Sequence, residues 1–371
     1  MSDFTGHSQD PHAGWIRLTL IPGVGGETQR QLLKAFGMPE AIFSVSIPSL
    51  ASVIGPALAE RLHSHDCRQE IEAALVWAHQ PGNRLLTLAD ADYPQALLTS
   101  ADPPILLYAK GRVGLLNQPL LAMVGSRNAT HQGEANAEAF AAAFSQAGLG
   151  VVSGLALGID AAAHRGALKG RAGTVAVIGT GADRIYPARN ADLTRTIADQ
   201  GCIISEFALG TPPLTANFPR RNRLIAGLAL GCLVVEAAPR SGSLITARLA
   251  AEAGREVFAI PGSIHAPQSK GCHALIKQGA KLVESAQDVL EELRWEAVVA
   301  PLPTDSSDLV ESPDNGPEAA LLAALGHDPC NLDTLMARTD LTADALLAML
   351  LPLELDRRVA QLPGGLYQRL G

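Results

Sequence analysis

Short apolar runs alternate with longer, more polar stretches through the middle of the chain. The runs contain few charged residues, and most of them end at a glycine or a glutamate. Continuous apolar runs of this kind are typical of strands that are buried on both faces of a parallel sheet. We therefore predict strands at 120–125, 150–153, 174–179, 202–206, 232–236 and 256–262.

The stretches between these runs are predicted to be helical. One helix covers residues 134–147, and others begin near Asp160, Ala191, Arg223 and Leu244. Repeated alternation of strand and helix predicts a doubly wound, mostly parallel α/β sheet. Ligands of such sheets bind beyond the carboxyl ends of the strands, so function is expected in the loops that follow the strands.

The first 116 residues are predicted to form a small, all-helical domain. A glycine-rich turn at 21–28 precedes a helical stretch at 30–37, and two short extended pieces lie at 85–88 and 105–108. The turn resembles that of a helix-hairpin-helix, whose backbone N–H groups can bind a DNA phosphate. A plain connector between two helices explains the turn equally well.

The sheet region is predicted to span residues 117–295 and to be followed by a linker at 296–316 that is rich in proline, serine and aspartate. Residues 317–371 contain three helical stretches and a closing hairpin, which is the pattern of a winged helix. This last domain holds seven acidic residues and four arginines. A helix that enters a DNA groove needs a positive face, so the charge favours a protein contact or a structural role.

The whole chain is acidic, with a formal net charge of -8 and a pI near 5.7. Any binding of nucleic acid must therefore depend on a local positive surface. The five cysteines are scattered, without the spacing of a zinc site or a disulfide framework, as expected in a reducing cytosol. No signal peptide and no membrane-spanning run is recognisable, so we predict a cytoplasmic protein without a membrane partner.

A cluster of arginines is the strongest local charge in this acidic chain. Arg220, Arg221 and Arg223 lie within four positions, and no carboxylate occurs in residues 207–233. The fork of N–H donors on arginine matches the geometry of phosphate. We therefore predict a positive site at the start of a helix, with a phosphate-bearing ligand.

The loops after the predicted strands are rich in small residues, which let a ligand approach the backbone closely. Several such loops at one sheet edge predict a phosphate-binding rim. Neither a P-loop nor a dinucleotide fingerprint is present, so a single nucleotide is the weaker candidate ligand. The four loops lie at 125–128, 153–160, 179–183 and 240–247, and they include Gly125, Ser126, Arg127, Ser153, Gly154, Ser241, Gly242 and Ser243.

Four titratable residues could carry chemistry. Asp160 and His164 are four positions apart and could form an acid–base pair or part of a metal site, but we favour a helix cap at Asp160 with His164 packed against it. Glu206 and Glu236 end two predicted strands and could serve catalysis or hold the arginines in place. No complete catalytic motif accompanies them, so we predict no catalytic residue, no metal and no cofactor.

Taken together, these segments resemble the DNA-processing protein A (DprA/Smf) family. The resemblance covers residues 15–293 well and the tail loosely, and it implies an extended Rossmann domain between a sterile-alpha-motif-like N-terminal domain and a winged-helix tail. The motifs that carry it lie at 124–127, 153–164, 186–190, 218–227, 235–247 and 258–262.

The resemblance also implies a function. It indicates a homodimeric protein that binds single-stranded DNA, protects incoming DNA and helps load the RecA recombinase, notably during natural transformation. Arginines would clamp the backbone and Phe218 would stack on a base. The predicted DNA-binding residues are Gly125, Ser126, Arg127, Ser153, Gly154, Phe218, Arg220, Arg221, Asn222, Arg223, Ser241, Gly242 and Ser243.

An enzymatic interpretation is the alternative. Related Rossmann-like sheets hydrolyse nucleotides at a glycine-rich turn, and Glu206 or Glu236 would then be the catalytic acid or base. The Pro-Gly-Gly-x-Gly-Thr turn of those phosphoribohydrolases is replaced here by residues 239–243, with Arg240 where a glycine would admit the sugar. We therefore favour a binding protein that is not an enzyme.

Overall fold

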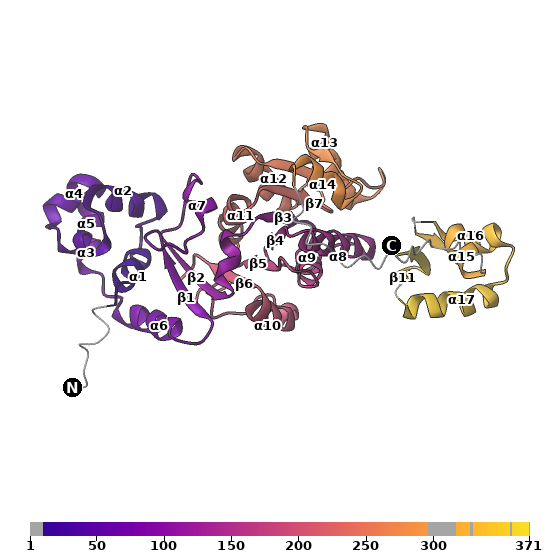
Figure 1. Cartoon of the computed structure of the whole chain (residues 1–371), viewed down its shortest axis with the longest axis horizontal. Helices are drawn as coiled ribbons and strands as arrows, with labels where there is room; N and C mark the ends of the chain where they lie inside the picture. Colours follow the sequence, from indigo (N-terminus) through magenta and orange to yellow (C-terminus); the bar gives the residue numbers. More distant parts are fainter. Residues whose placement is uncertain (1–9, 296–316, 327–328, 357, 371) are drawn as a thin grey trace. The chain divides into compact units, whose positions relative to one another are not determined.

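The computed structural model describes residues 10–295, 317–326, 329–356 and 358–370. These residues fall into two compact units (Figure 1). The first contains residues 10–128 and 137–295 and is called the body. The second contains residues 129–136 and the described residues from Pro317 onward, and the latter are called the C-terminal unit. The predicted linker at 296–316 lies outside the described residues, and each unit is described by itself.

Within the described residues, the body is organised around a nine-stranded sheet of order β1-β2-β6-β5-β4-β3-β7-β8-β9. Strands β3 to β9 are parallel, whereas β2 pairs antiparallel with β6 and β1 antiparallel with β2. The predicted mostly parallel α/β sheet is confirmed. The strands are β1 (Asn83–Thr87), β2 (Leu106–Gly111), β3 (Leu120–Val124), β4 (Gly150–Ser153), β5 (Thr174–Val177), β6 (Cys202–Ser205), β7 (Gly231–Val234), β8 (Glu256–Ala259) and β9 (Lys281–Leu282).

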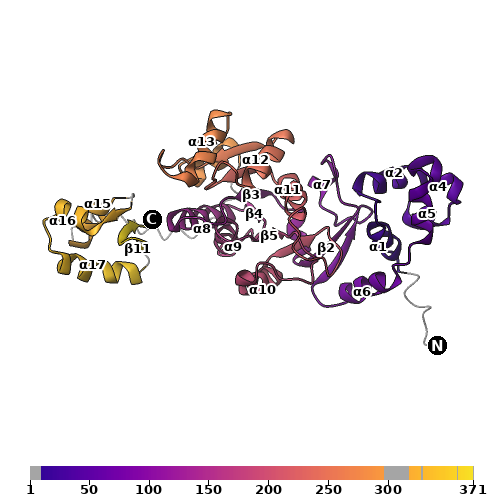
Figure 2. The ribbon, with the colours of Figure 1, turned by 180° about the vertical axis from the view of Figure 1, so that it is seen from behind.

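Helices cover both faces of this sheet, which is why strands β3 to β7 are buried along their whole length. Helices α9 and α10 pack on one face and α11 and α12 on the other, as Figures 1 and 2 show from opposite sides. None of the helices in the described ranges is long and apolar enough to span a bilayer. The helices of this region are α8 (His131–Gln146), α9 (Ile159–Ala167), α10 (Ala191–Gln200), α11 (Asn217–Leu228), α12 (Ser243–Glu252), α13 (Lys270–Lys277) and α14 (Ala286–Glu292), with short 3-10 helices η2 (Val113–Asn117), η3 (Ala188–Asn190) and η4 (Pro267–Ser269).

Helix α11 begins at Asn217, earlier than the predicted start near Arg223. Pro219 lies in its first turn, where a missing N–H breaks no helical hydrogen bond. The arginine cluster is therefore part of the helix and does not precede it. Arg220 and Arg223 are three positions apart and share one face of the helix, whereas Arg221 points in another direction.

The first region is helical except for β1 and β2, which were predicted only as extended pieces and extend the central sheet. Its helices pack around a core that includes Trp15, Leu32 and Leu62. The ring of Trp77 meets that of Tyr108 edge-on at 5.6 Å, which joins α6 to β2. The helices are α1 (Ala13–Leu20), α2 (Gly26–Phe36), α3 (Pro39–Ser44), α4 (Ile47–Ile54), α5 (Pro56–Ser64), α6 (Arg68–Ala78) and α7 (Gln95–Leu98).

The C-terminal unit has the predicted three helices and hairpin, and it forms a winged helix. Its small sheet has the order β10-β12-β11. Leu335, Leu346 and Leu350 are fully buried in its core. The elements are α15 (Pro317–Leu325), β10 (Cys330–Asn331), α16 (Leu332–Thr339), α17 (Ala343–Leu355), β11 (Val359–Leu362) and β12 (Leu366–Arg369).

Candidate functional site

A cleft of about 630 Å³ opens at the carboxyl ends of the central strands. From β3 the chain proceeds through β4, β5 and β6 on one side, and then crosses to β7 on the other side of β3. The loops after β3 and β7 therefore diverge, which is where doubly wound sheets bind ligands. The cleft is lined by the loop after β3, the first turns of α11 and the loop that precedes α12.

The loop after β3 begins at Gly125, a position at which no side chain fits. A Cβ on this residue would lie 2.6 Å from Cγ1 of Ile159 and 2.9 Å from the carbonyl oxygen of Glu236. Ser126 follows and accepts a hydrogen bond on Oγ from the N–H of Asn128 at 3.1 Å. The tight turn directs the exposed side chain of Arg127 into the cleft lining.

Arg127 forms a cluster with two aromatic side chains. Its guanidinium carbon lies 5.2 Å from the ring centre of Phe218, and the ring of Tyr186 lies 5.9 Å from that of Phe218. Tyr186 is 42% exposed. A smaller hollow of about 210 Å³ continues behind this cluster. A cation beside accessible aromatic faces suits a ligand that combines negative charge with flat rings.

The opposite wall of the cleft is the loop from Arg240 to the start of α12. The hydroxyl groups of Ser241 and Ser243 are 2.7 Å apart, and Asn222 donates from Nδ2 to the carbonyl oxygen of Gly242 at 3.3 Å. This bond ties α11 to the loop at the N-terminus of α12. The first turn of α12 contains no acidic residue, so its N–H groups and dipole favour an anion there.

Arg221 lines the cleft but is 4% exposed, and its guanidinium is held by the protein itself. Nη1 donates to the main-chain carbonyl oxygens of Gly154 and Val177. Burial lowers the pKa of Arg221 to about 10, with Asp160 opposing the shift, so the side chain remains charged at neutral pH. A solvent-facing phosphate clamp, as predicted from the sequence, does not fit this position.

Arg220 and Arg223 do not line the cleft. Arg223 donates to Oε2 of Glu206 and to the carbonyl oxygen of Asp102, and its Nε lies 3.1 Å from Asp102 Oδ2. Arg220 is 60% exposed, lies over the ring of Phe207 and is 3.8 Å from the same Glu206 oxygen. Burial raises the pKa of Glu206, although the two arginines oppose the shift. The prediction of a positive site without neutralising carboxylates is therefore wrong. Glu206 and Asp102, which come from distant parts of the chain, lie beside Arg220 and Arg223.

The helix that follows β4 holds its polar groups inside the protein. Asp160 does not cap this helix, because its Oδ2 accepts from the N–H groups of Gly154 and Ala156 in the preceding loop. His164 does not bond to Asp160 either, since its Nδ1 lies 2.7 Å from Oγ1 of Thr174. Burial raises the pKa of Asp160, with the charge of Arg221 opposing, and lowers that of His164 to about 3. Asp160 thus holds the loop that precedes α9, and His164 connects α9 to β5.

The structure brings most of the predicted residues to one cleft: Gly125, Ser126, Arg127, Phe218, Arg221, Asn222, Ser241, Gly242 and Ser243. Gly154 lines the smaller hollow, and Ser153 is buried with its hydroxyl donating to the carbonyl oxygen of Met123 at 2.6 Å. Tyr186, Arg240 and Asn128 also line the cleft and were not predicted as site residues. Tyr186 and Arg240 stand in sequence motifs that could have indicated them.

The charge of the lining indicates an anionic ligand. The ionic side chains of the cleft are Arg127, Arg221 and Arg240 against the buried carboxylate of Asp160. This local excess of cations stands in a chain of net charge -8. Across the described residues, no three His, Cys, Asp or Glu side chains gather as metal ligands would.

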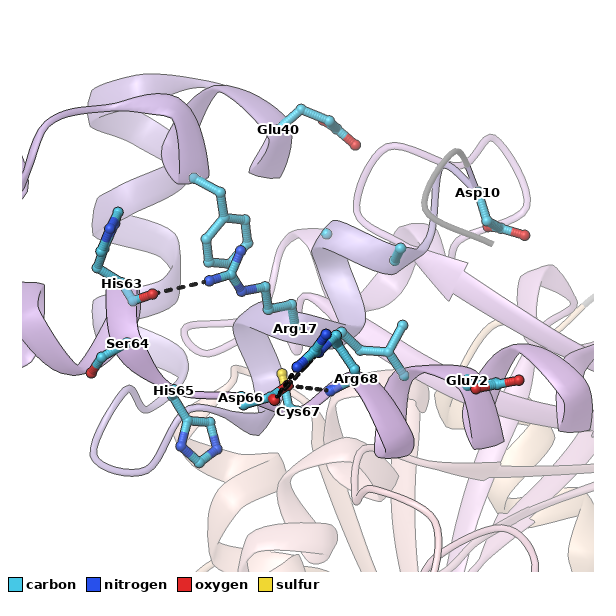
Figure 3. Close-up of a pocket in the computed structure, with 14 residues that line it drawn as sticks. Asp10, Arg17, Glu40, His63, Ser64, His65, Asp66, Cys67, Arg68 and Glu72 are labelled. Carbon is cyan, nitrogen blue, oxygen red and sulfur yellow. Dashed lines mark hydrogen bonds and ion pairs between the residues drawn. The ribbon is translucent and has the colours of Figure 1, made fainter. Parts of the chain in front are cut away.

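A second hollow, of about 620 Å³, lies among α1, α3, α5 and α6 of the body (Figure 3). Its arginines are engaged: Arg17 lies 4.0 Å above the ring centre of Phe43, and Arg68 bonds to Asp66, whose pKa this contact lowers to about 2. Glu40 and Glu72 add further carboxylates to the lining. An acidic lining does not suit phosphate, so the cleft at the sheet edge is the candidate site.

Comparison with known proteins agrees with this architecture. A family model described as DNA recombination-mediator protein A matches residues 84–294, and one described as the DprA winged helix domain matches residues 305–365. The chain belongs to the DprA family. Protein Smf of Escherichia coli strain K12 is 39% identical to it over 361 residues, which cover 96% of this chain and 95% of that protein. The resemblance found in the sequence is confirmed.

Two solved DprA structures are similar to the chain. DprA of Streptococcus pneumoniae is 40% identical with a TM-score of 0.67, and the match covers 76% of this chain and 97% of that one. DprA of Helicobacter pylori is 31% identical with a TM-score of 0.52, and the match covers 57% of this chain and 95% of that one. The Helicobacter pylori protein is described as having a unique single-stranded DNA binding mode.

Proposed function

We propose that the cleft at the carboxyl ends of β3 and β7 binds the backbone of single-stranded DNA. The observation that carries this proposal is the placement of Arg127 beside Phe218 and Tyr186, opposite Arg240 and the N-terminus of α12. Arginine and helix N–H groups hold phosphate, and aromatic faces stack on bases without regard to sequence. In a duplex the bases are already stacked on one another, so the aromatic faces favour a single strand.

The site assignment follows from which side chains are accessible. Arg127, Arg240, Ser126, Asn222, Ser241, Gly242 and Ser243 are proposed to contact phosphates, and Phe218 and Tyr186 to stack on bases. Arg221, Gly154 and Ser153 are proposed to support the cleft from behind, because their polar groups are bonded inside the body. Arg220 is exposed and can extend the path of the strand beyond the cleft.

The test is a titration of fluorescent oligo(dT), followed by anisotropy, with the variants Arg127→Ala and Arg240→Ala. Arg195→Ala is the matched control, since Arg195 is 68% exposed on α10 and away from the cleft lining. A charge-assisted bond contributes about 1.5–3 kcal/mol, so each cleft variant is expected to bind roughly tenfold or more weakly. Wild-type affinity in both cleft variants would contradict the proposal.

Salt dependence checks that phosphates are bound. The logarithm of the association constant is expected to fall with the logarithm of salt concentration by about 0.7 per phosphate neutralised in a single strand. Arg127→Ala is expected to reduce this slope by about one such unit. An affinity that is the same at low and high salt would rule out binding through phosphates.

The finer role that the family implies is part of the same proposal. The chain is proposed to act as a homodimer in the cytoplasm, to protect incoming single strands and to help load RecA onto them during natural transformation and recombination. The rate at which RecA starts ATP hydrolysis on a protein-coated single strand, with and without this chain, tests the loading step. An unchanged rate would remove that step and leave DNA binding in place.

A non-catalytic role is proposed as well. Neither Glu206 nor Glu236 lines the cleft, and Glu206 is paired with Arg223. The carboxylate that does line it, Asp160, accepts two main-chain hydrogen bonds. Release of free base from nucleoside monophosphates that is lost in Glu236→Gln would instead support the nucleotide-hydrolysing alternative.

A further inference from the structure

Helix α17 of the C-terminal unit carries apolar residues on opposite faces. On its inner face Leu346, Leu350 and Leu353 are at most 1% exposed and form part of the core. On its outer face Leu347, Leu351 and Leu355 are 43%, 59% and 76% exposed. A helix that is apolar all round is normally covered on both sides. The outer face, called the α17 face and consisting of these three leucines, is therefore left uncovered by the described residues of the C-terminal unit.

The geometry of the α17 face suits a helix. Its leucines follow one another at every fourth position and form a ridge about 12 Å long at 1.5 Å per residue. Ridges of this spacing pack into the groove between the equivalent ridges of a second helix. The exposed Ala348 beside the ridge allows a close approach.

The charged residues around the ridge indicate which charge a partner helix should carry. Asp344 lies before its first leucine, and Glu354 and Asp356 flank its last; all three are exposed. Helix α17 contains no lysine or arginine. Among the described residues, the first basic residue after α17 is Arg358, and its Nη1 lies 3.9 Å from Oε2 of Glu318. The described part of the C-terminal unit contains six acidic residues and three arginines.

We infer that the α17 face binds an amphipathic helix of a protein partner whose apolar stripe is flanked by lysine or arginine. Two other occupants fit the charges less well. In a pair of α17 helices from two copies, either orientation would bring carboxylates of both copies together at the ends of the ridge. To bind duplex DNA, the third helix of a winged helix needs basic side chains, and α17 has none.

The experiment uses the full chain and synthetic labelled peptides. One peptide is an amphipathic helix with a leucine stripe and lysines at all other positions, the second has glutamate in place of every lysine, and the third has the lysines kept and the stripe scrambled. Binding is measured by anisotropy for the wild type and for Leu351→Asp and Leu355→Asp. Val76→Asp is the control, because Val76 is 52% exposed on α6 of the body and receives the same added charge.

The lysine peptide with the intact stripe is expected to bind the wild type, and the other two peptides are expected not to. Each leucine variant is expected to weaken binding about tenfold through lost apolar burial, and Val76→Asp to leave it unchanged. The aspartate that each leucine variant introduces would by itself attract the lysine peptide. Weaker binding by these variants would therefore come from the lost apolar contact. Thermal unfolding verifies that the leucine variants remain folded, as their exposure predicts.

Three results would overturn the inference. The first is equal peptide binding by the wild type and both leucine variants. The second is self-association of the wild type, measured by sedimentation velocity, that Leu351→Asp reduces, since the occupant would then be a second copy. The third is a loss of duplex DNA affinity in Leu351→Asp. None of these readouts depends on the cleft of the body, so they are independent of the proposed single-strand binding.

Discussion

Arg221 donates a hydrogen bond from its guanidinium to the main-chain carbonyl oxygen of Gly154 in the interior of the body. The same nitrogen donates to the carbonyl oxygen of Val177. Gly154 directly follows β4, and Val177 is the last residue of β5. One side chain from α11 thus joins the ends of two neighbouring strands, directly beneath the cleft.

Replacement of Arg221 by lysine is therefore expected to reduce stability. Lysine keeps the charge but cannot reproduce the planar fork, and the buried carbonyl groups would lose their donor. A loss of about 3 kcal/mol in the free energy of unfolding is expected, as for other broken buried charge contacts. Urea denaturation measures it, and Arg220→Lys, at a 60% exposed position, is the control. Equal denaturation midpoints for both variants would show that the Arg221 bonds contribute little.

Gly154 is expected to tolerate no side chain. A Cβ there would lie 2.0 Å from Nη1 of Arg221 and 2.5 Å from its guanidinium carbon, so the arginine would have to move. Gly154→Ala is expected to cost about 1–3 kcal/mol, the range for overpacked cores. Gly114→Ala is the matched control, because a Cβ at Gly114 would meet no atom within 4 Å. Thermal unfolding of the two variants side by side measures the difference, and identical melting temperatures would contradict the expectation.

The pattern of apolar residues was sufficient to predict the sheet. Strands β3 to β8 were predicted because buried parallel strands need continuous apolar runs, and this requirement is local. The sequence also predicted that Gly125 and Ser241 lie at the same edge of the sheet, because the carboxyl ends of parallel strands share one edge. The antiparallel additions β1 and β2 depend on a pairing with β6, to which no local pattern points.

The partners of individual side chains could not be predicted. Arg220, Arg221 and Arg223 look alike in sequence, yet one is mostly exposed, one is buried under the cleft and one is ion-paired. Their environments differ because α11 directs Arg221 into the body and away from Arg220 and Arg223. Asp102 and Glu206, which pair with the other two arginines, come from elements that are distant in sequence. Long-range contacts of this kind are decided by tertiary packing.

His164 is expected to make the body sensitive to acid. Oγ1 of Thr174 donates to the carbonyl oxygen of Val151 at 2.8 Å, so it must accept from Nδ1 of His164, and Nε2 is buried without a hydrogen-bond partner. The ring is therefore neutral. Burial lowers its pKa to about 3, aided by the charges of Arg221 and Arg165.

The sign of the effect follows from proton uptake. An unfolded histidine takes up a proton near pH 6.5, whereas the folded one resists until about pH 3. The stability that this residue contributes is complete above pH 6.5 and is lost as the pH falls toward 3, by up to about 1.4 kcal/mol per pH unit. His164→Gln, with a neutral side chain, is expected to show a smaller loss of unfolding free energy between neutral and mildly acidic pH. If the unfolding free energies of the wild type and His164→Gln changed with pH in parallel, this role of His164 would be contradicted.

Tyr186 allows the stacking and the ionic parts of the proposed DNA contact to be separated. Its ring is 42% exposed and lies beside Phe218, on the side of the cleft where Arg127 is also placed. Tyr186→Ala is expected to weaken binding of oligo(dT) by about 1–3 kcal/mol, the contribution of one stacked base. Tyr186→Phe keeps the ring and is expected to bind like the wild type. The slope of affinity against salt should be unchanged in both variants, because neither removes a charge. A full loss of affinity in Tyr186→Phe would instead assign the contact to the hydroxyl group, and a changed slope in Tyr186→Ala would mean that the ring acts by positioning Arg127.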